Sequence, residues 1–353
     1  MERSSYMLRV SATLQLAAIA LALAAAHARA ADGASQAGII AQCWTAEQLR
    51  QRPEEIRPQR SLAGAPVPVP RQSLAPHGRE APGAVRRVEL PPGSRKLIAL
   101  TFDLCETPGE IAGYDGPIFD YLRANAVKAT VFAGGKWMLT HDERGQRTRQ
   151  LMADPLFEVA NHGWSHQNLR LLQGAALERE IEGPQAAYQA VRARLAREQC
   201  IGVPRSMSAI PERMRLMRFP FGACNREALD AVAAAGMIPI QWDISTGDPS
   251  PGTSAAAIVA EMLRARPGSI IIAHANGRGF HTAEALPIAI PKLKAKGFEF
   301  VTVSELIAAG RPVVEQQCYN ARPGDTDRYD TFFRPKPRQV PASDGRNAPA
   351  LPR

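Results

Sequence analysis

Short apolar runs alternate with longer amphipathic stretches through the middle of the chain. Helical periodicity covers Ala175–Arg197, Arg226–Ala235 and Ala255–Arg264, and the last two stretches end at Gly236 and at Pro267-Gly268. Between the helices lie apolar runs with the length of strands: Leu97–Phe102, Ala129–Phe132, Phe157–Ala160, Leu216–Phe219, Ile238–Trp242 and Ser269–Ala273. This alternation predicts a parallel α/β architecture.

The apolar pattern is lost toward both ends. Residues 31–95 are rich in proline and are predicted to form an extended N-terminal arm. Residues 311–353 form a C-terminal arm rich in proline and charge, and we expect its end to be disordered. Residues 96–310 remain for the folded domain, and they are enough for one sizeable core.

Residues 1–30 have the pattern of a signal peptide. They combine an arginine-bearing start, an apolar stretch over Leu14–Ala25 and an Ala28-Arg29-Ala30 ending. The apolar stretch falls short of the roughly 20 residues of a membrane span, although a retained N-terminal anchor is the alternative. We therefore expect a periplasmic or secreted protein with no membrane span in its mature chain.

Charge and cysteine content agree with export. Residues 1–30 hold three arginines and one glutamate, so removing them changes the formal charge from +9 to +7. A basic surface favours anionic partners. Because no nucleic-acid-binding motif is found, we expect an envelope polymer, and not nucleic acid, as the partner. The five cysteines allow two disulfides and one free thiol in an oxidising compartment. A bridge between the arms, Cys43 with Cys318, is our hypothesis for one pair.

Polar residues follow the predicted strands directly. In a parallel barrel the carboxyl ends of the strands open onto one face, so residues far apart in sequence converge there. Together these positions predict a site at that face, and they are Asp103, His162, His166, Arg218, Asp243 and His274.

Three of these positions suggest a metal site with a carboxylate beside it. His162 and His166 are four residues apart, which on a helical turn would let both imidazoles bind one divalent cation. The two-residue period of a strand places Asp103 on the face opposite Phe102, where a buried carboxylate must be paired, ligated or catalytic. Taken singly, each residue also fits an ordinary structural role.

At this point the order of segments resembles the polysaccharide deacetylase family, the NodB-homology domain of the family-four carbohydrate esterases. Five segments over residues 96–310 carry the resemblance: Thr101-Phe102-Asp103, His162 to His166, Arg218-Phe219-Pro220-Phe221-Gly222, Trp242-Asp243 through Asp248, and Ile272-Ala273-His274. The resemblance implies a distorted (β/α) TIM-like barrel and an exported, metal-dependent hydrolase of N-acetylated glycans. Chitooligosaccharide, peptidoglycan or another N-acetylglucosamine polymer would be the substrate.

The resemblance also implies roles for the site residues. Asp103 becomes the general base and His274 the general acid, while Arg218 orients Asp103. His162 and His166 become ligands of a divalent metal, for which zinc is expected. Asp243 and Asp248 lie in the fourth segment, and which of them tunes His274 stays open.

One departure from the family affects the metal. The family usually has a second aspartate, itself a ligand, directly after the first, and this chain has Leu104. We expect Glu106 to supply the third ligand, with Asp103 as the alternative. Two other functions remain open: a non-catalytic glycan-binding descendant that lost the metal, and an amidohydrolase acting on a small non-sugar amide.

Overall fold

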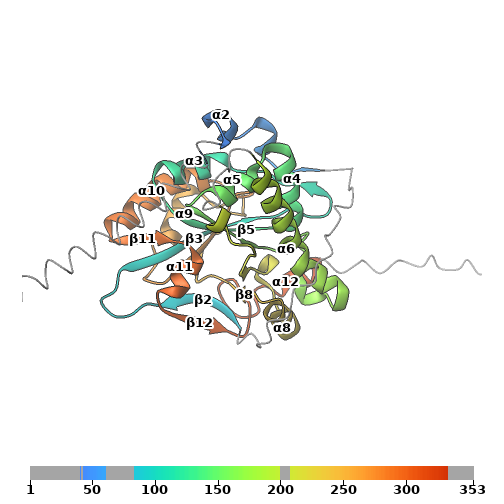
Figure 1. Cartoon of the computed structure of the whole chain (residues 1–353). Helices are drawn as coiled ribbons and strands as arrows, with labels where there is room; N and C mark the ends of the chain where they lie inside the picture. Colours follow the sequence, from blue (N-terminus) through green and yellow to red (C-terminus); the bar gives the residue numbers. More distant parts are fainter. Residues whose placement is uncertain (1–39, 41–42, 61–82, 199–206, 333–353) are drawn as a thin grey trace, which may run out of the picture.

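The computed structural model describes residues 40, 43–60, 83–198 and 207–332. Its largest sheet has the strand order β8-β7-β6-β5-β3-β10-β9, with β11 also paired to β3, and every pairing is parallel. The strands curl into part of a barrel with helices around it (Figure 1). The strands are β3 (Lys96–Leu104), β5 (Ala129–Ala133), β6 (Phe157–Asn161), β7 (Leu216–Met217), β8 (Ile238–Pro239), β9 (Ile244–Ser245), β10 (Ile270–His274) and β11 (Phe298–Val301).

The predicted strands and helices lie where the apolar pattern placed them. Each of the six predicted strands overlaps an observed one, and the three predicted helices correspond to α6, α8 and α9. The distorted (β/α) barrel is therefore confirmed. The helices are α2 (Ala46–Leu49), α3 (Gly116–Ala124), α4 (Gly135–Gly145), α5 (Arg147–Ala153), α6 (Gly174–Arg197), α8 (Arg226–Ala234), α9 (Ala255–Met262), α10 (Thr282–Ala295), α11 (Val303–Ala308) and α12 (Arg328–Phe332).

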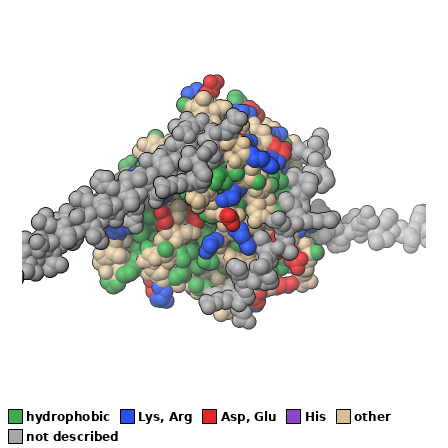
Figure 2. All heavy atoms as spheres, viewed as in Figure 1, with side chains coloured by type: hydrophobic (Ala, Val, Ile, Leu, Met, Phe, Trp, Pro, Cys, Tyr) green, Lys and Arg blue, Asp and Glu red, His purple; other side chains and the backbone are tan. Residues whose placement is uncertain are grey.

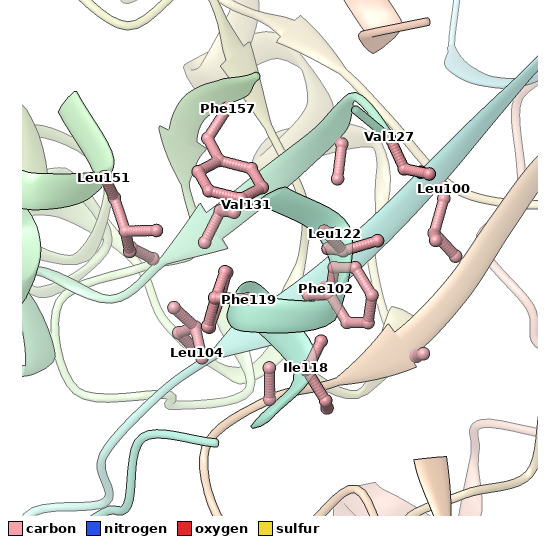
Figure 3. Close-up of a cluster of buried hydrophobic side chains, with 14 of the residues drawn as sticks. Leu100, Phe102, Leu104, Ile118, Phe119, Leu122, Val127, Val131, Leu151 and Phe157 are labelled. Atoms are coloured by element: carbon pink, nitrogen blue, oxygen red, sulfur yellow. The ribbon is translucent and has the colours of Figure 1, made fainter. Parts of the chain in front are cut away.

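Strand β3 presents a different chemistry on each of its faces. Its outer side chains Leu100, Phe102 and Leu104 are fully buried and pack with Phe119 of α3, as Figure 3 shows. On the opposite face the Thr101 hydroxyl donates to the carbonyl of Ile271, 2.7 Å away. This alternation is the two-residue period expected of a strand, and it directs polar side chains toward the inside of the barrel.

Parts of both predicted arms pack on the barrel. Strand β2 (Ala84–Glu89) pairs antiparallel with β12 (Arg311–Glu315), so segments from opposite ends of the chain lie side by side (Figure 1). Val85 and Val88 of β2 are buried, and Val85 also bridges to Ile240 beside the barrel sheet. A second two-stranded sheet joins β1 (Gln59–Arg60) to β4 (Glu110–Ile111).

The segment before β1 docks through a buried arginine. Arg147 of α5 binds the Glu55 carboxylate with two hydrogen bonds of 2.8 and 2.9 Å, and it donates to the backbone carbonyls of Gln48 and Arg50. Burial alone would raise the pKa of Glu55, but the hydrogen bonds and the charge of Arg147 lower it. The bidentate geometry fixes this segment in register against α5.

Acidic and basic side chains mix on the surface. On the face in Figure 2, Lys and Arg lie among Asp, Glu and apolar side chains, so the basic charge is not gathered there into one continuous patch. In the described part of the chain, no helix has the length and apolar character needed to cross a membrane. The predicted signal peptide, residues 1–30, lies outside the described residues.

Candidate active site

Parallel pairing places a carboxylate and an imidazole side by side. Asp103 at the end of β3 is in register with His274 at the end of β10. Both residues line a cavity of about 500 Å³ at the carboxyl ends of the strands, and His166 lines it as well. The expected convergence of strand-end residues on one face is therefore present.

Arg218 holds Asp103 by a buried ion pair. Its Nη1 donates to Asp103 Oδ1 at 2.7 Å and to Thr101 Oγ1 at 2.8 Å, and the Arg218 side chain is fully buried. Burial alone would raise the pKa of Asp103, but the charge and the hydrogen bond of Arg218 help to hold it below its ordinary value. The Asp103 carboxylate is therefore kept ionised.

His162 presents one ring nitrogen to the site. Its Nδ1 lies 3.0 Å from the carbonyl oxygen of Arg218, and because a carbonyl only accepts, Nδ1 carries the proton. Its Nε2 keeps the lone pair and is buried without a hydrogen-bond partner, 3.4 Å from Asp103 Oδ2. Burial lowers the pKa of His162, which favours the neutral, metal-binding form.

A loop, and not the helical turn we expected, brings His166 next to His162. The two rings lie 5.1 Å apart between centroids, and positive φ angles of 77° at Gly163 and 55° at His166 turn the chain. The buried Glu180 carboxylate fixes this loop by accepting from the backbone N–H groups of Trp164 and Ser165, both at 2.9 Å. Sequence reasoning missed Glu180, because its partners, which include two backbone N–H groups and the Ser165 hydroxyl, lie on a loop that no local pattern links to α6.

Asp248 holds His274 on the other side of the site. Asp248 Oδ1 accepts from His274 Nδ1 at 2.9 Å, and Oδ2 accepts from the His274 backbone N–H and the Thr282 hydroxyl, both at 2.7 Å. Burial alone would lower the pKa of His274, but the Asp248 carboxylate raises it above its ordinary value. The geometry thus assigns the partner of His274 to Asp248.

Two predicted site residues are not brought into the cluster. Asp243 accepts from Ser269 Oγ and from the N–H of Ile270, both at 2.9 Å, so it lies at the start of β10, the end opposite His274. Glu106 accepts from the N–H of Ala112 at 3.2 Å and lies 3.4 Å from Lys136 Nζ. These contacts do not favour a catalytic role for Asp243 or a ligand role for Glu106.

Cys105 completes the group of donor atoms at the site. Its sulfur and one ring nitrogen from each of His162 and His166 all lie within 4.8 Å of one another. Cys105 is buried and forms no disulfide, and Asn276 Nδ2 donates to its sulfur at 3.4 Å. Burial, and next the charge of Asp103, raise the pKa of the Cys105 thiol well above its usual value.

The strand period held a signal for Cys105 that the sequence interpretation did not use. Residues two apart along a strand share a face, so a continuation of β3 puts residue 105 on the side of Asp103. Leu104 takes the opposite side, in the outer hydrophobic cluster (Figure 3).

The C-terminal segment forms one wall of the cavity. Asn320, Arg328 and Tyr329 line it, and Asn320 accepts a hydrogen bond from Trp242 Nε1 at 3.0 Å. The Tyr329 ring packs 5.1 Å from the ring of Phe221, which in turn packs 4.3 Å from that of His166.

A disulfide holds this wall in place. Cys318 is bonded to Cys224, with an S–S distance of 2.01 Å, so the predicted pairing of Cys318 with Cys43 is wrong. Cys224 follows the third motif, and the bridge therefore ties the C-terminal segment to the edge of the site. Sequence alone could not choose among the pairings, because connectivity depends on which cysteines the fold brings together.

The fold and the site define a distorted (β/α) barrel in which a buried carboxylate and an imidazole lie beside a pair of histidines. Residues 91–240 match the family described as polysaccharide deacetylase. The resemblance noted from the motifs is confirmed over this part of the barrel, where the chain is similar to that family.

Two relatives act on N-acetylated sugars according to their names. Peptidoglycan-N-acetylglucosamine deacetylase PgdA of Listeria monocytogenes is 28% identical over 229 residues, which are 65% of this chain and 42% of PgdA. The chitooligosaccharide deacetylase of Rhizobium leguminosarum bv. trifolii is 29% identical over 214 residues, 57% of this chain and 87% of that protein. The match thus spans less than half the length of PgdA.

A solved structure agrees with the fold. The Bc1960 peptidoglycan N-acetylglucosamine deacetylase has a TM-score of 0.51 at 23% identity, covering 65% of this chain and 94% of that chain. At this identity the likeness shows the barrel fold.

Proposed function

We propose that this protein is an exported, metal-dependent deacetylase that hydrolyses the acetamide of N-acetylated glycans. One observation carries the proposal: Asp103 and His274 are neighbours in register, and each is held by its own buried partner beside the two histidines. Chitooligosaccharide, peptidoglycan and other N-acetylglucosamine polymers are the proposed substrates, in agreement with the names of the relatives.

The donor atoms fit a divalent metal, for which zinc is the proposed ion. His162 and His166 would hold it, because His162 Nε2 is buried and unpartnered and both imidazoles are favoured in the neutral form. When bound, the ion polarises the acetamide carbonyl and stabilises the negative charge that develops on its oxygen.

Asp103 then serves as the general base. Arg218 keeps its carboxylate ionised and fixes Oδ1, which leaves Oδ2 to take a proton from the attacking water. Asp103 Oδ2 lies 3.4 Å from His162 Nε2, so the base would take its proton from a water held beside the metal-binding atoms.

His274 serves as the general acid. Asp248 holds Nδ1, so Nε2 is the nitrogen that can deliver a proton to the departing amine. The raised pKa keeps His274 protonated to higher pH than a free imidazole. An amine is a poor leaving group, and its protonation is the step for which this acid is placed.

The cavity suits a sugar chain. Phe221, Trp242 and Tyr329 offer apolar ring faces, and Arg278 and Arg328 supply polar hydrogens beside them. At about 500 Å³ the cavity is large enough for a ligand well beyond acetamide itself.

Export accounts for the disulfide. The Cys224–Cys318 bridge is typical of an oxidising compartment, and it supports the periplasmic or secreted location proposed from residues 1–30. N-terminal sequencing of the protein recovered from cell fractions tests this location; a chain that keeps residues 1–30 in the cytoplasm would contradict it.

The test of substrate class is acetate release from a matched panel. We expect release from N-acetylglucosamine oligomers and from peptidoglycan fragments, with little from small acetamides, and release at least about 10²–10⁴-fold slower in the Asp103→Asn variant. Preferential hydrolysis of small acetamides would favour the non-sugar amidohydrolase instead. Glycan binding without any acetate release would favour a non-catalytic descendant.

A further inference from the structure

We propose that Cys105 is the third protein ligand of the metal site, which makes its donor set one thiolate and two imidazoles. The inference rests on the metal dependence proposed above and goes beyond it by naming the ligand that replaces the family's second aspartate. It assigns a role to the one described cysteine that forms no disulfide.

The distances fit a common ion. Around a tetrahedral zinc with Zn–S near 2.3 Å and Zn–N near 2.0 Å, donor atoms lie roughly 3.5 Å apart. The sulfur of Cys105 and the ring nitrogens of His162 and His166 lie within 4.8 Å of one another. Side-chain movements of about 1 Å would bring the three donor atoms to these distances.

Two further contacts point to a ligand at this place. The Nε2 lone pair of His162 is buried and has no partner, which is costly unless something occupies the site. Asn276 is buried, and its Nδ2 donates both to the Cys105 sulfur at 3.4 Å and to the Cys105 carbonyl at 3.1 Å. Such outer hydrogen bonds orient a metal ligand and tune its basicity.

The neighbouring side chains are otherwise engaged. Leu104 packs in the outer hydrophobic cluster, and the Glu106 carboxylate binds Ala112 and faces Lys136. Asp103 is fixed by Arg218 and is needed as the base. With Cys105 as ligand, the base and the third ligand are separate residues, and Asp103 need not serve as both.

A thiolate changes which ions the site prefers. Sulfur is a soft donor, so the site should select zinc and cobalt over magnesium, calcium and manganese, which prefer oxygen. A protonated Cys105 does not compete with this assignment, because a coordinating thiol gives up its proton to solvent when the metal binds.

Cobalt substitution tests the ligand directly. We expect the Co²⁺ form of the wild-type protein to show a thiolate-to-cobalt charge-transfer absorption in the near ultraviolet. X-ray absorption of the Zn²⁺ form should show one sulfur at about 2.3 Å. Both signals should vanish in Cys105→Ser, and zinc affinity should fall about 10–100-fold or more.

Two variants serve as matched controls. Cys105→Asp should restore part of the zinc affinity through an oxygen donor without restoring the charge-transfer absorption. Glu106→Gln should keep that absorption, and circular dichroism checks that each variant is folded. An identical cobalt spectrum in wild type and Cys105→Ser, or a zinc shell of nitrogen and oxygen only, overturns the assignment.

The outcome separates this inference from the proposed function. Acetate release by a metal-bound protein without a sulfur ligand would overturn the role of Cys105 and leave the deacetylase intact. A sulfur-ligated metal without acetate release would uphold the role of Cys105 and overturn the deacetylase proposal. A protein that takes up no metal overturns both.

Discussion

The two sides of the site hold their carboxylates for opposite purposes. On the β3 side, Asp103 faces the buried Arg218 guanidinium, and its pKa is lowered. On the β10 side, Asp248 faces an imidazole that also borders the cavity, and the pKa of His274 is raised. The charge of the partner thus suits each group to its proposed role: a guanidinium keeps the proposed base ionised, and a carboxylate keeps the proposed acid protonated.

The largest expected effect comes from neutralising the β3 side. Asp103→Asn keeps the side-chain shape but removes the base, so acetate release should fall by at least about 10²–10⁴-fold. Zinc affinity should stay, because we propose Cys105, and not Asp103, as the third ligand. Initial rates and zinc titration measure both quantities.

Asp243→Asn is the matched control for that variant. It makes the same chemical change at a carboxylate that caps β10 outside the cavity. Loss of zinc in the Asp103 variant, with rates otherwise preserved, would make Asp103 a ligand and contradict its role as base.

Removing the acid should affect amides more than esters. His274→Ala should lower amide hydrolysis by about 10²–10⁴-fold. The rate of hydrolysis of an activated ester should fall much less, because a good leaving group departs without a proton. Steady-state rates on a matched amide and ester decide this, and equal losses on both would argue against His274 as the acid.

Asp248→Asn should shift a pH limb rather than abolish activity. The general acid works below its pKa, so the rate falls as pH rises through the pKa of His274. Losing the Asp248 charge lowers the pKa of His274 and moves the alkaline limb of kcat/KM to lower pH. On that limb, each unit by which the pKa falls lowers kcat/KM about tenfold. The acidic limb, set by Asp103, should stay. A shift of the acidic limb instead would reverse the assignment of acid and base.

The smallest expected effect is at the C-terminal wall. Tyr329→Ala removes a ring that packs on Phe221, and KM for an oligomer should rise about 2–10-fold with little change in kcat. Tyr329→Phe keeps the ring and should behave as wild type. Unchanged KM in the alanine variant would mean that the substrate does not reach this wall.

The barrel and much of the site could be predicted because they depend on local patterns. The apolar runs at β3, β5, β6 and β10 fixed the strand-end positions of Asp103 and His274. Two strands of the barrel sheet were missed: β9 is only two residues long, and β11 follows a helix without a clear boundary in the pattern.

Asp243 shows where the strand pattern misled. The apolar run Ile238–Trp242 predicted a strand ending beside Asp243, but β8 spans only Ile238–Pro239. The chain then passes across the barrel, with Ile240 bridged to Val85 and the Asp243 carboxylate on the N–H of Ile270. The apolar pattern correctly indicated that residues 239–242 of this run are buried, but it did not indicate the direction in which the chain runs there.

Contacts between distant segments could not be predicted from sequence. The Cys224–Cys318 bridge and the packing of Tyr329 on Phe221 join residues about a hundred positions apart, and no local periodicity encodes them.

Zinc titration against acetate release tests the central claim most directly. Metal-free protein is given increasing zinc, and the release of acetate from an N-acetylglucosamine oligomer is measured at each point. We expect no release without metal, a rise with added zinc and saturation at one equivalent per chain. Acetate release that is unchanged by removing and restoring zinc, or an oligomer bound but never hydrolysed at full zinc occupancy, would contradict the account.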